Sequence, residues 1–164
     1  MNFKNYTLKS QEAIQQAQQI ATSFNHQAIE NGHILKAISE VDENVTPFLL
    51  KKLGVNYKNV IQAIDRIIDS YPSVTGGNQY LSKTANQSLN HASNYLKQFE
   101  DEYVSIEHLI LGILKSGELL LEHLKDKKSL NDTITRLFII PKYDHSIKLS
   151  TAAFENLKND QQIN

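Results

Sequence analysis

The sequence predicts an all-α fold built from two tandem four-helix repeats related by a pseudo-twofold axis. Apolar residues recur three and four positions apart through most of the 164-residue chain, as one buried helix face requires. This pattern stops over residues 71–80 and then begins again. A unit of about 70 residues buries too little surface to fold alone, so the two halves are expected to share one core.

Two helices open the first half. One is expected over residues 10–25, where a single apolar stripe faces inward, and the next over residues 31–41. The stripe of the first helix consists of Ala13, Ile14, Ala17, Ile20, Ala21 and Phe24.

Two shorter segments complete that half. Thr46 and Pro47 are typical of the N-cap and first residue of a helix, which is expected to end at Gly54. Asn56 is the expected cap of a fourth helix. The inward residues of this fourth helix are Val60, Ile61, Ile64 and Ile68.

Residues 71–80 form an exposed connector, because Pro72 and a glycine pair interrupt a helix there. Beyond it, a shift of 75 positions lays the first two helices of the second half on those of the first, and we call this match the repeat alignment; further along, the shift falls to 71 and then changes to 73. Its identical pairs are Ala17 and Ala92, Phe24 and Phe99, His33 and His108, and Ile38 and Ile113. We therefore divide the chain into a first repeat (1–70), the connector (71–80), a second repeat (81–138) and a tail or start of a linker (139–164).

Composition excludes several classes of function. With 17 basic and 18 acidic residues the net charge is −1, so non-specific binding to nucleic acid or to an anionic membrane is not expected. The chain has no cysteine, which excludes disulfides, thiolate catalysis and zinc ribbons. No apolar run approaches the roughly 20 residues that span a bilayer. We expect a cytoplasmic protein with no membrane or nucleic-acid partner.

Histidine, glycine and serine patterns give no sign of catalysis. His33 and His108 occupy equivalent places, and we interpret each imidazole as a partner of backbone groups at a helix start rather than a ligand or base. Glu30 and His33 have the spacing of half a di-iron site, but Ser105 stands where that Glu should repeat. There is no phosphate-binding loop and no nucleophile elbow. We expect no metal, no cofactor and no enzymatic activity.

An acidic group surrounds the predicted start of the sixth helix and leaves two interpretations open. Its members are Glu100, Asp101, Glu102 and Glu107. They are either a solvated loop with carboxylates at a helix N-terminus, where the helix dipole favours negative charge, or the polar edge of a peptide-binding groove.

Two segments resemble the Clp repeat domain found at the amino terminus of the Clp AAA+ unfoldases. They are IENGHILKAI (29–38) and VSIEHLILGI (104–113). The opening FKNYTLKSQEA (3–13) and the connector PSVTGG (72–77) are most similar to the disaggregase branch, ClpB. The resemblance covers about residues 1–138.

This resemblance implies a non-catalytic module that captures unfolded or aggregated polypeptide, or an adaptor protein. Such a module passes its substrate to an AAA+ ring of the same or a partner chain. It also implies roles in substrate binding for Thr7, Asp101 and Glu107, and it places an apolar groove near Leu89. We add Tyr103 as a second apolar contact. Thr7 is equally suited to be a plain N-cap.

Departures from the family pattern leave alternatives. His91 and His108 stand where the ClpB branch often has aliphatic residues, which makes the groove more polar. The ClpC branch binds phosphoarginine with a Glu directly before the His of each repeat. Glu107 matches this Glu in the second repeat, but Gly32 stands in its place in the first repeat. The alternatives are a free-standing Clp-repeat adaptor or regulatory protein, and a ClpA- or ClpC-type module that docks adaptors of a Clp protease.

Spacing predicts how the site assembles. Thr7 opens the first helix, while Asp101 and Glu107 flank the start of the sixth. If the halves pair, the first helix of one approaches the second helix of the other, and these three residues converge. We expect both carboxylates to be exposed, so that replacing them with Ala weakens capture and leaves the melting temperature nearly unchanged.

Overall fold

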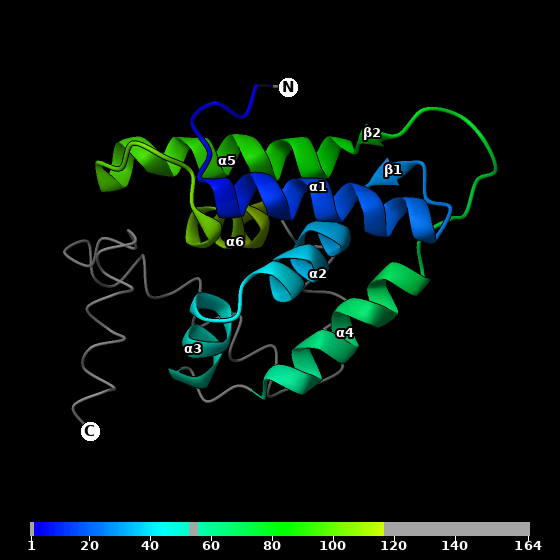
Figure 1. Ribbon diagram of the computed structural model, residues 1–164, viewed down its shortest axis with the longest axis horizontal. Helices are drawn as coiled ribbons and strands as arrows, with labels where there is room; N and C mark the ends of the chain where they lie inside the picture. The colour runs from blue at the N-terminus through cyan, green and yellow to red at the C-terminus, as the bar shows by residue number, and fades with distance from the viewer. Residues whose placement is uncertain (1, 53–55, 117–164) are drawn as a thin grey trace.

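The computed structural model describes residues 2–52 and 56–116 (Figure 1). The helices and strands are α1 (Leu8–Ser23), β1 (Ala28–Ile29), α2 (Asn31–Val41), α3 (Val45–Lys52), α4 (Tyr57–Asp69), β2 (Tyr80–Leu81), α5 (Lys83–Phe99) and α6 (Ile106–Ser116). The all-α class is therefore confirmed. The expected end of the third helix at Gly54, the last two helices of the second repeat and the tail lie outside the described residues.

Helices α1 and α5 begin in the same way. The Thr7 hydroxyl accepts a hydrogen bond from Ser10 N–H (3.2 Å), and the Ser82 hydroxyl accepts one from Ala85 N–H (3.0 Å). Because Thr7 caps α1, the helix starts two residues before the predicted position. The two caps occupy equivalent positions in the repeat alignment.

Helix α3 corrects one prediction. Thr46 is not its N-cap, because the helix already begins at Val45. The buried Asp42 carboxylate accepts hydrogen bonds from the N–H groups of Asn44, Val45 and Thr46 at 2.7–3.1 Å, and from the Thr46 hydroxyl at 2.7 Å. The cap thus comes from a side chain placed ahead of the helix.

Helix α4 begins as predicted, with Asn56 Oδ1 accepting from Asn59 N–H (3.2 Å). Its buried residues are Ile64, Ile67 and Ile68. Val60 and Ile61, predicted to face inward, are only half-buried.

Two short parallel pairings join the halves, and the sequence did not reveal them. Ala28 pairs with Tyr80 and Ile29 with Leu81, while Tyr6 forms an isolated bridge with Val104. In the repeat alignment Ile29 corresponds to Val104 and Tyr6 to Leu81, so the two pairings are equivalent. Asn25 and Glu100, which are also equivalent in this alignment, both adopt left-handed backbone conformations, with φ of 55° and 57°. The contacts between the halves therefore follow the predicted internal symmetry.

The core lies around α2 and α6. Helix α2 packs against α1 and α4 and lies between them in Figure 1, while α6 packs closely against α5. Helix α6 also contacts α1, α2 and α3, so it is covered on most sides. At Gly112 the two backbones approach so closely that a Cβ would collide with α5. In the described part of the chain, no helix has the length and apolar character needed to cross a bilayer.

Candidate functional site

The start of α1 lies directly beside the loop that enters α6. Thr7 N–H donates to the Val104 carbonyl (3.0 Å), and Val104 N–H donates to the Asn5 carbonyl (2.8 Å). These bonds place Thr7 against the loop that carries Asp101 and Tyr103. Thr7, Asp101 and Tyr103 therefore belong to one small region, which includes two of the three residues that were expected to converge.

Two apolar side chains are exposed in this region. Leu8 is 84% exposed and Tyr103 is 52% exposed, whereas Tyr6 and Val104, which pair with each other, are buried. We call the surface formed by Thr7, Leu8, Asp101 and Tyr103 the α1/α6 entry surface. Sequence reasoning missed Leu8, although an apolar residue directly after the N-cap and outside the buried stripe was a readable signal.

Asp101 is held by a buried histidine. Ser105 N–H donates to His108 Nδ1 (3.0 Å), so the proton of a neutral His108 lies on Nε2. That nitrogen is 2.9 Å from Asp101 Oδ2 and donates to it. The His108 ring is buried, while the Asp101 side chain keeps 24% exposure. The carboxylate is thus oriented from within and still reaches solvent.

Leu89 and Glu107 lie beneath the surface rather than on it. Each is only 3% exposed. The expectation that both carboxylates are exposed is therefore wrong for Glu107, and Leu89 offers no apolar contact at the surface. The cause is the central position of α6, in which every residue from Ile106 to Leu114 is buried.

The first half contains an equivalent arrangement with different chemistry. Glu30 N–H donates to His33 Nδ1 (2.9 Å), and His33 Nε2 lies 2.8 Å from His26 Nδ1. His26 and His33 correspond to Asp101 and His108 in the repeat alignment. The interpretation of both repeat histidines as partners of backbone N–H groups is confirmed. The contact with His26 was missed, although this alignment could have indicated it.

Burial controls the protonation of this pair. Desolvation, assisted by the neighbouring His26, lowers the pKa of His33 to about 4. Desolvation also lowers the pKa of His26, with the Asp69 carboxylate acting in the opposite direction. Both rings are therefore neutral at physiological pH, and the His33 Nε2–H group donates to His26.

Tyr71 fastens the connector to the histidine pair. Its hydroxyl accepts a hydrogen bond from Gly32 N–H (3.2 Å), and its ring lies 5.1 Å from that of His33 and 5.8 Å from that of His26. Burial raises the pKa of Tyr71 to about 12. Residues 72–78, which follow, are exposed as predicted.

Across residues 2–52 and 56–116, no group of three or more histidine, cysteine or acidic side chains has the geometry to hold a metal ion. The polar side chains of the entry surface accept and donate hydrogen bonds and leave apolar surface exposed beside them. Such a surface is suited to recognition.

Equivalent caps, pairings and histidine contacts in two halves define a tandem helical-repeat domain. The family described as Clp repeat (R) N-terminal domain matches residues 5–127, and the chain belongs to this family.

The relatives include ClpB chaperones. The chain is 43% identical over 141 residues to chaperone protein ClpB of Bacteroides thetaiotaomicron. The matched segment covers 84% of this chain and 16% of that protein. The chain is also 45% identical over 114 residues to ClpB of Porphyromonas gingivalis, covering 70% of this chain and 13% of that protein. The chain thus spans less than a fifth of the length of these relatives.

Solved N-terminal domains share the fold. The Hsp104 N-terminal domain of Candida albicans superposes with a TM-score of 0.69 at 18% identity, covering 82% of this chain and 92% of that one. The ClpV N-domain in complex with a VipB peptide gives a TM-score of 0.62 at 14% identity, covering 88% and 92%.

Proposed function

We propose that this chain is a substrate-recruiting module of a ClpB-like, ATP-dependent chaperone. It binds unfolded or aggregated polypeptide and passes it to an AAA+ ring of the same or a partner chain in the cytoplasm. The module itself neither binds nor hydrolyses ATP. The membership in the Clp N-terminal family and the similarity to ClpB chaperones support this role.

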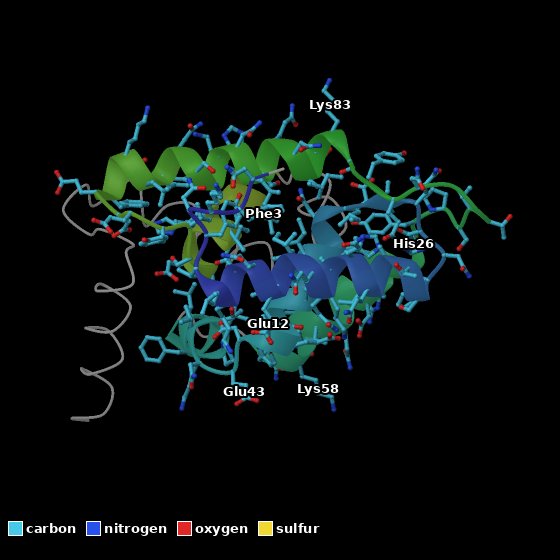
Figure 2. All side chains as sticks on the ribbon, turned by 45° about the horizontal axis from the view of Figure 1, so that its top comes forward. Phe3, Glu12, His26, Glu43, Lys58 and Lys83 are labelled. Carbon is cyan, nitrogen blue, oxygen red and sulfur yellow. The ribbon has the colours of Figure 1, made fainter. Side chains whose placement is uncertain are left out.

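The observation that carries the proposal is the exposed apolar pair of the α1/α6 entry surface. Leu8 and Tyr103 expose apolar side chains on two segments that the Thr7–Val104 hydrogen bond joins, and Asp101 lies in the same loop as Tyr103. At the equivalent place in the other half, Lys83 replaces Leu8 and Ala28 replaces Tyr103. Lys83 points away from the molecule at the start of α5 (Figure 2). Capture is therefore expected at one of the two related places only.

Each residue contributes differently to binding. Tyr103 and Leu8 cover apolar side chains of the polypeptide, and Asp101 accepts hydrogen bonds from its backbone or pairs with its basic side chains. Thr7 fixes the start of α1 against the α6 loop. Leu89 and Glu107 support the surface from the interior. The small contact area makes capture weak and reversible.

The test is a titration of a fluorescently labelled, chemically denatured model protein with the chain. We expect saturable binding to the denatured protein and none to its folded form. Leu8→Ser combined with Tyr103→Ser should weaken binding, whereas Lys83→Ser, at the equivalent position of Leu8, should not. If the variant with Leu8→Ser and Tyr103→Ser binds the denatured protein as tightly as the Lys83→Ser variant, the entry surface is not the binding site.

A docking role for folded or specific partners is the second candidate. A ClpV N-domain in complex with a VipB peptide shows that a domain of this fold can recognise a defined partner segment. A chain with this role would leave denatured protein unbound and would still co-purify with a Clp ring. The same titration, followed by a pull-down, separates the two functions.

A further inference from the structure

A hollow of about 340 Å³ lies between α1, α2 and α4, along the half of α1 that is remote from Thr7 and Leu8. It arises because α1 and α4 both pack on α2 while making little direct contact with each other. A volume of this size falls within the range of pockets that receive a ligand or a side chain, about 300–1,000 Å³.

The floor and one wall of the hollow are apolar. Ile20 and Ile68 form the buried floor. Phe24 forms the wall; it stacks on the His26 ring at 5.6 Å and still keeps 43% exposure. An exposed aromatic ring beside buried aliphatic side chains is suited to the methylene stem of a long side chain.

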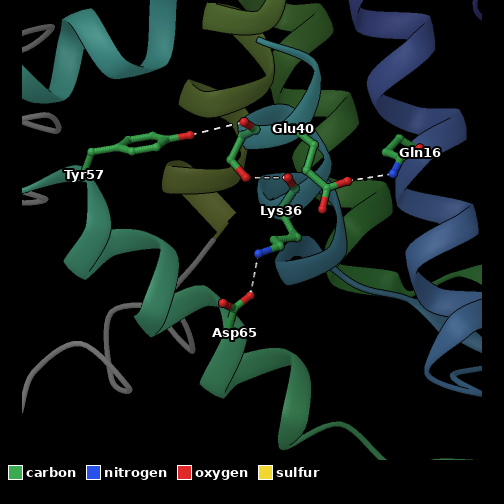
Figure 3. Close-up of polar contacts among 6 residues, drawn as sticks. Gln16, Lys36, Glu40, Tyr57 and Asp65 are labelled. Atoms are coloured by element: carbon green, nitrogen blue, oxygen red, sulfur yellow. Dashed lines mark hydrogen bonds and ion pairs between the residues drawn. The ribbon is translucent and has the colours of Figure 1, made fainter. Parts of the chain in front are cut away.

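The rim carries an excess of negative charge, and Figure 3 shows its contacts. Lys36 Nζ forms an ion pair with Asp65 Oδ1 (2.8 Å). Gln16 Nε2 donates to Glu40 Oε2 (2.6 Å). Within the described residues, Glu40 thus has a neutral amide as its partner, and the two carboxylates face one ammonium group. The hollow is complementary to one additional cation.

We propose that this hollow receives an arginine side chain of a bound polypeptide. The guanidinium pairs with Glu40, and its stem lies on Ile20 and against Phe24. Arginine fits better than lysine, because its planar guanidinium pairs with a carboxylate through two hydrogen bonds. The inference rests on the proposed function for the class of partner and adds a second contact point with its own side-chain preference.

The probe is the acetylated and amidated peptide Gly-Leu-Arg-Leu-Gly, compared with the same peptide containing citrulline, the neutral analogue of arginine. Backbone amide NMR shifts of the whole chain report where each peptide binds. We expect the arginine peptide to shift amides of α1, α2 and α4, and the citrulline peptide to bind about tenfold more weakly, as loss of a charge-assisted hydrogen bond requires.

Matched variants locate the contact. Glu40→Gln keeps an acceptor for Gln16 but removes the charge, and it should weaken the arginine peptide about tenfold. Glu43→Gln removes an exposed charge that does not line the hollow and should have no effect. Ser23→Phe fills the hollow and should abolish binding, whereas Thr22→Phe on the neighbouring exposed position should not.

Equal binding of the arginine and citrulline peptides overturns the inference, and so does binding that Glu40→Gln and Ser23→Phe leave unchanged. Absence of any peptide binding also overturns it, while capture of denatured protein through Leu8 and Tyr103 would still support the proposed function. Conversely, hollow-dependent peptide binding without capture of denatured protein supports the hollow and rejects the proposed function.

Discussion

Acidification should destabilise the chain through the buried His26–His33 pair, and one substitution should reduce this effect. Well above pH 6.5 His33 is neutral in the folded and unfolded states and contributes no pH dependence. The unfolded chain takes up a proton near its ordinary pKa of 6.5, whereas the folded chain does so only at about 4. Between these values the unfolded state binds more protons, so the free energy of unfolding falls as the pH falls.

The two pKa values set the magnitude. Each unit of difference corresponds to about 1.4 kcal/mol, so His33 alone removes about 3 kcal/mol of stability between about pH 6.5 and pH 4. Burial of the two rings is the main cause of the lowered pKa values, and the unprotonated nitrogens His33 Nδ1 and His26 Nδ1 each already have a hydrogen-bond donor. Protonating His33 Nδ1 breaks the bond from Glu30 N–H, and protonating His26 Nδ1 brings two N–H groups face to face.

The second half of the chain indicates which substitution should reduce the acid-induced loss of stability. Asp101 occupies the position equivalent to His26 and accepts from the ring of His108. His26→Asp should therefore place a carboxylate opposite His33, raise the pKa of His33 and reduce the acid-induced loss. His26→Asn offers a neutral acceptor of the same size and should remain as acid-sensitive as the native chain.

The assay is urea unfolding followed by circular dichroism at several pH values between about 7 and 4, with the His33 ring titrated by NMR. Other carboxylates titrate in this range, so the informative quantity is the difference between His26→Asp and His26→Asn. Identical pH slopes for these two variants, or a His33 ring that titrates near 6.5 in the folded chain, would refute the reasoning.

Three further changes test the packing and capping. Gly112→Ala inserts a Cβ into the α5 backbone and should cost about 1–3 kcal/mol of stability in urea unfolding; an unchanged midpoint would mean that the helices are not in close contact. Asp42→Ala removes the acceptor of three backbone N–H groups and should cost about 2 kcal/mol, with loss of helical signal from α3. Asp101→Ala leaves His108 without its acceptor and should lower the melting temperature, corresponding to about 1–3 kcal/mol, while the exposed neighbour Glu102→Ala should change stability by less than about 0.5 kcal/mol. Equal melting temperatures for the last two variants would contradict the role given to the buried histidine.

Periodicity and caps were enough to predict the all-α class and the correspondence between the starts of the two halves, while the third and fourth helices expected in the second repeat lie outside the described residues. The bounds of α2, the cap at Asn56 and the alignment that pairs Thr7 with Ser82 follow from local rules that depend on neighbouring residues only. The histidine positions were also interpretable, because a helix start needs acceptors for its N–H groups. Each of these features is determined by residues that are close together in the sequence.

Features that depend on distant contacts were not predictable. The strand pairings involve two residues each, which is too short for an alternating pattern to appear. The cap of α3 was missed for a local reason, because Asp42 lies three residues before the helix and the Thr-Pro pair that follows looked like the better start. Glu107 is buried because α6 is enclosed by helices of both halves, and a one-sided pattern gives no warning of that.

The most direct test of the proposed capture is to locate the polypeptide contact on the surface. A photo-reactive p-benzoylphenylalanine is introduced in place of Leu8 in one protein and in place of Lys83, its equivalent in the other half, in a second. Each is irradiated with a denatured model protein. Capture at the α1/α6 entry surface should give crosslinks from position 8 and few from position 83. Equal crosslinking from both positions, or crosslinking from position 83 alone, would contradict capture at the α1/α6 entry surface.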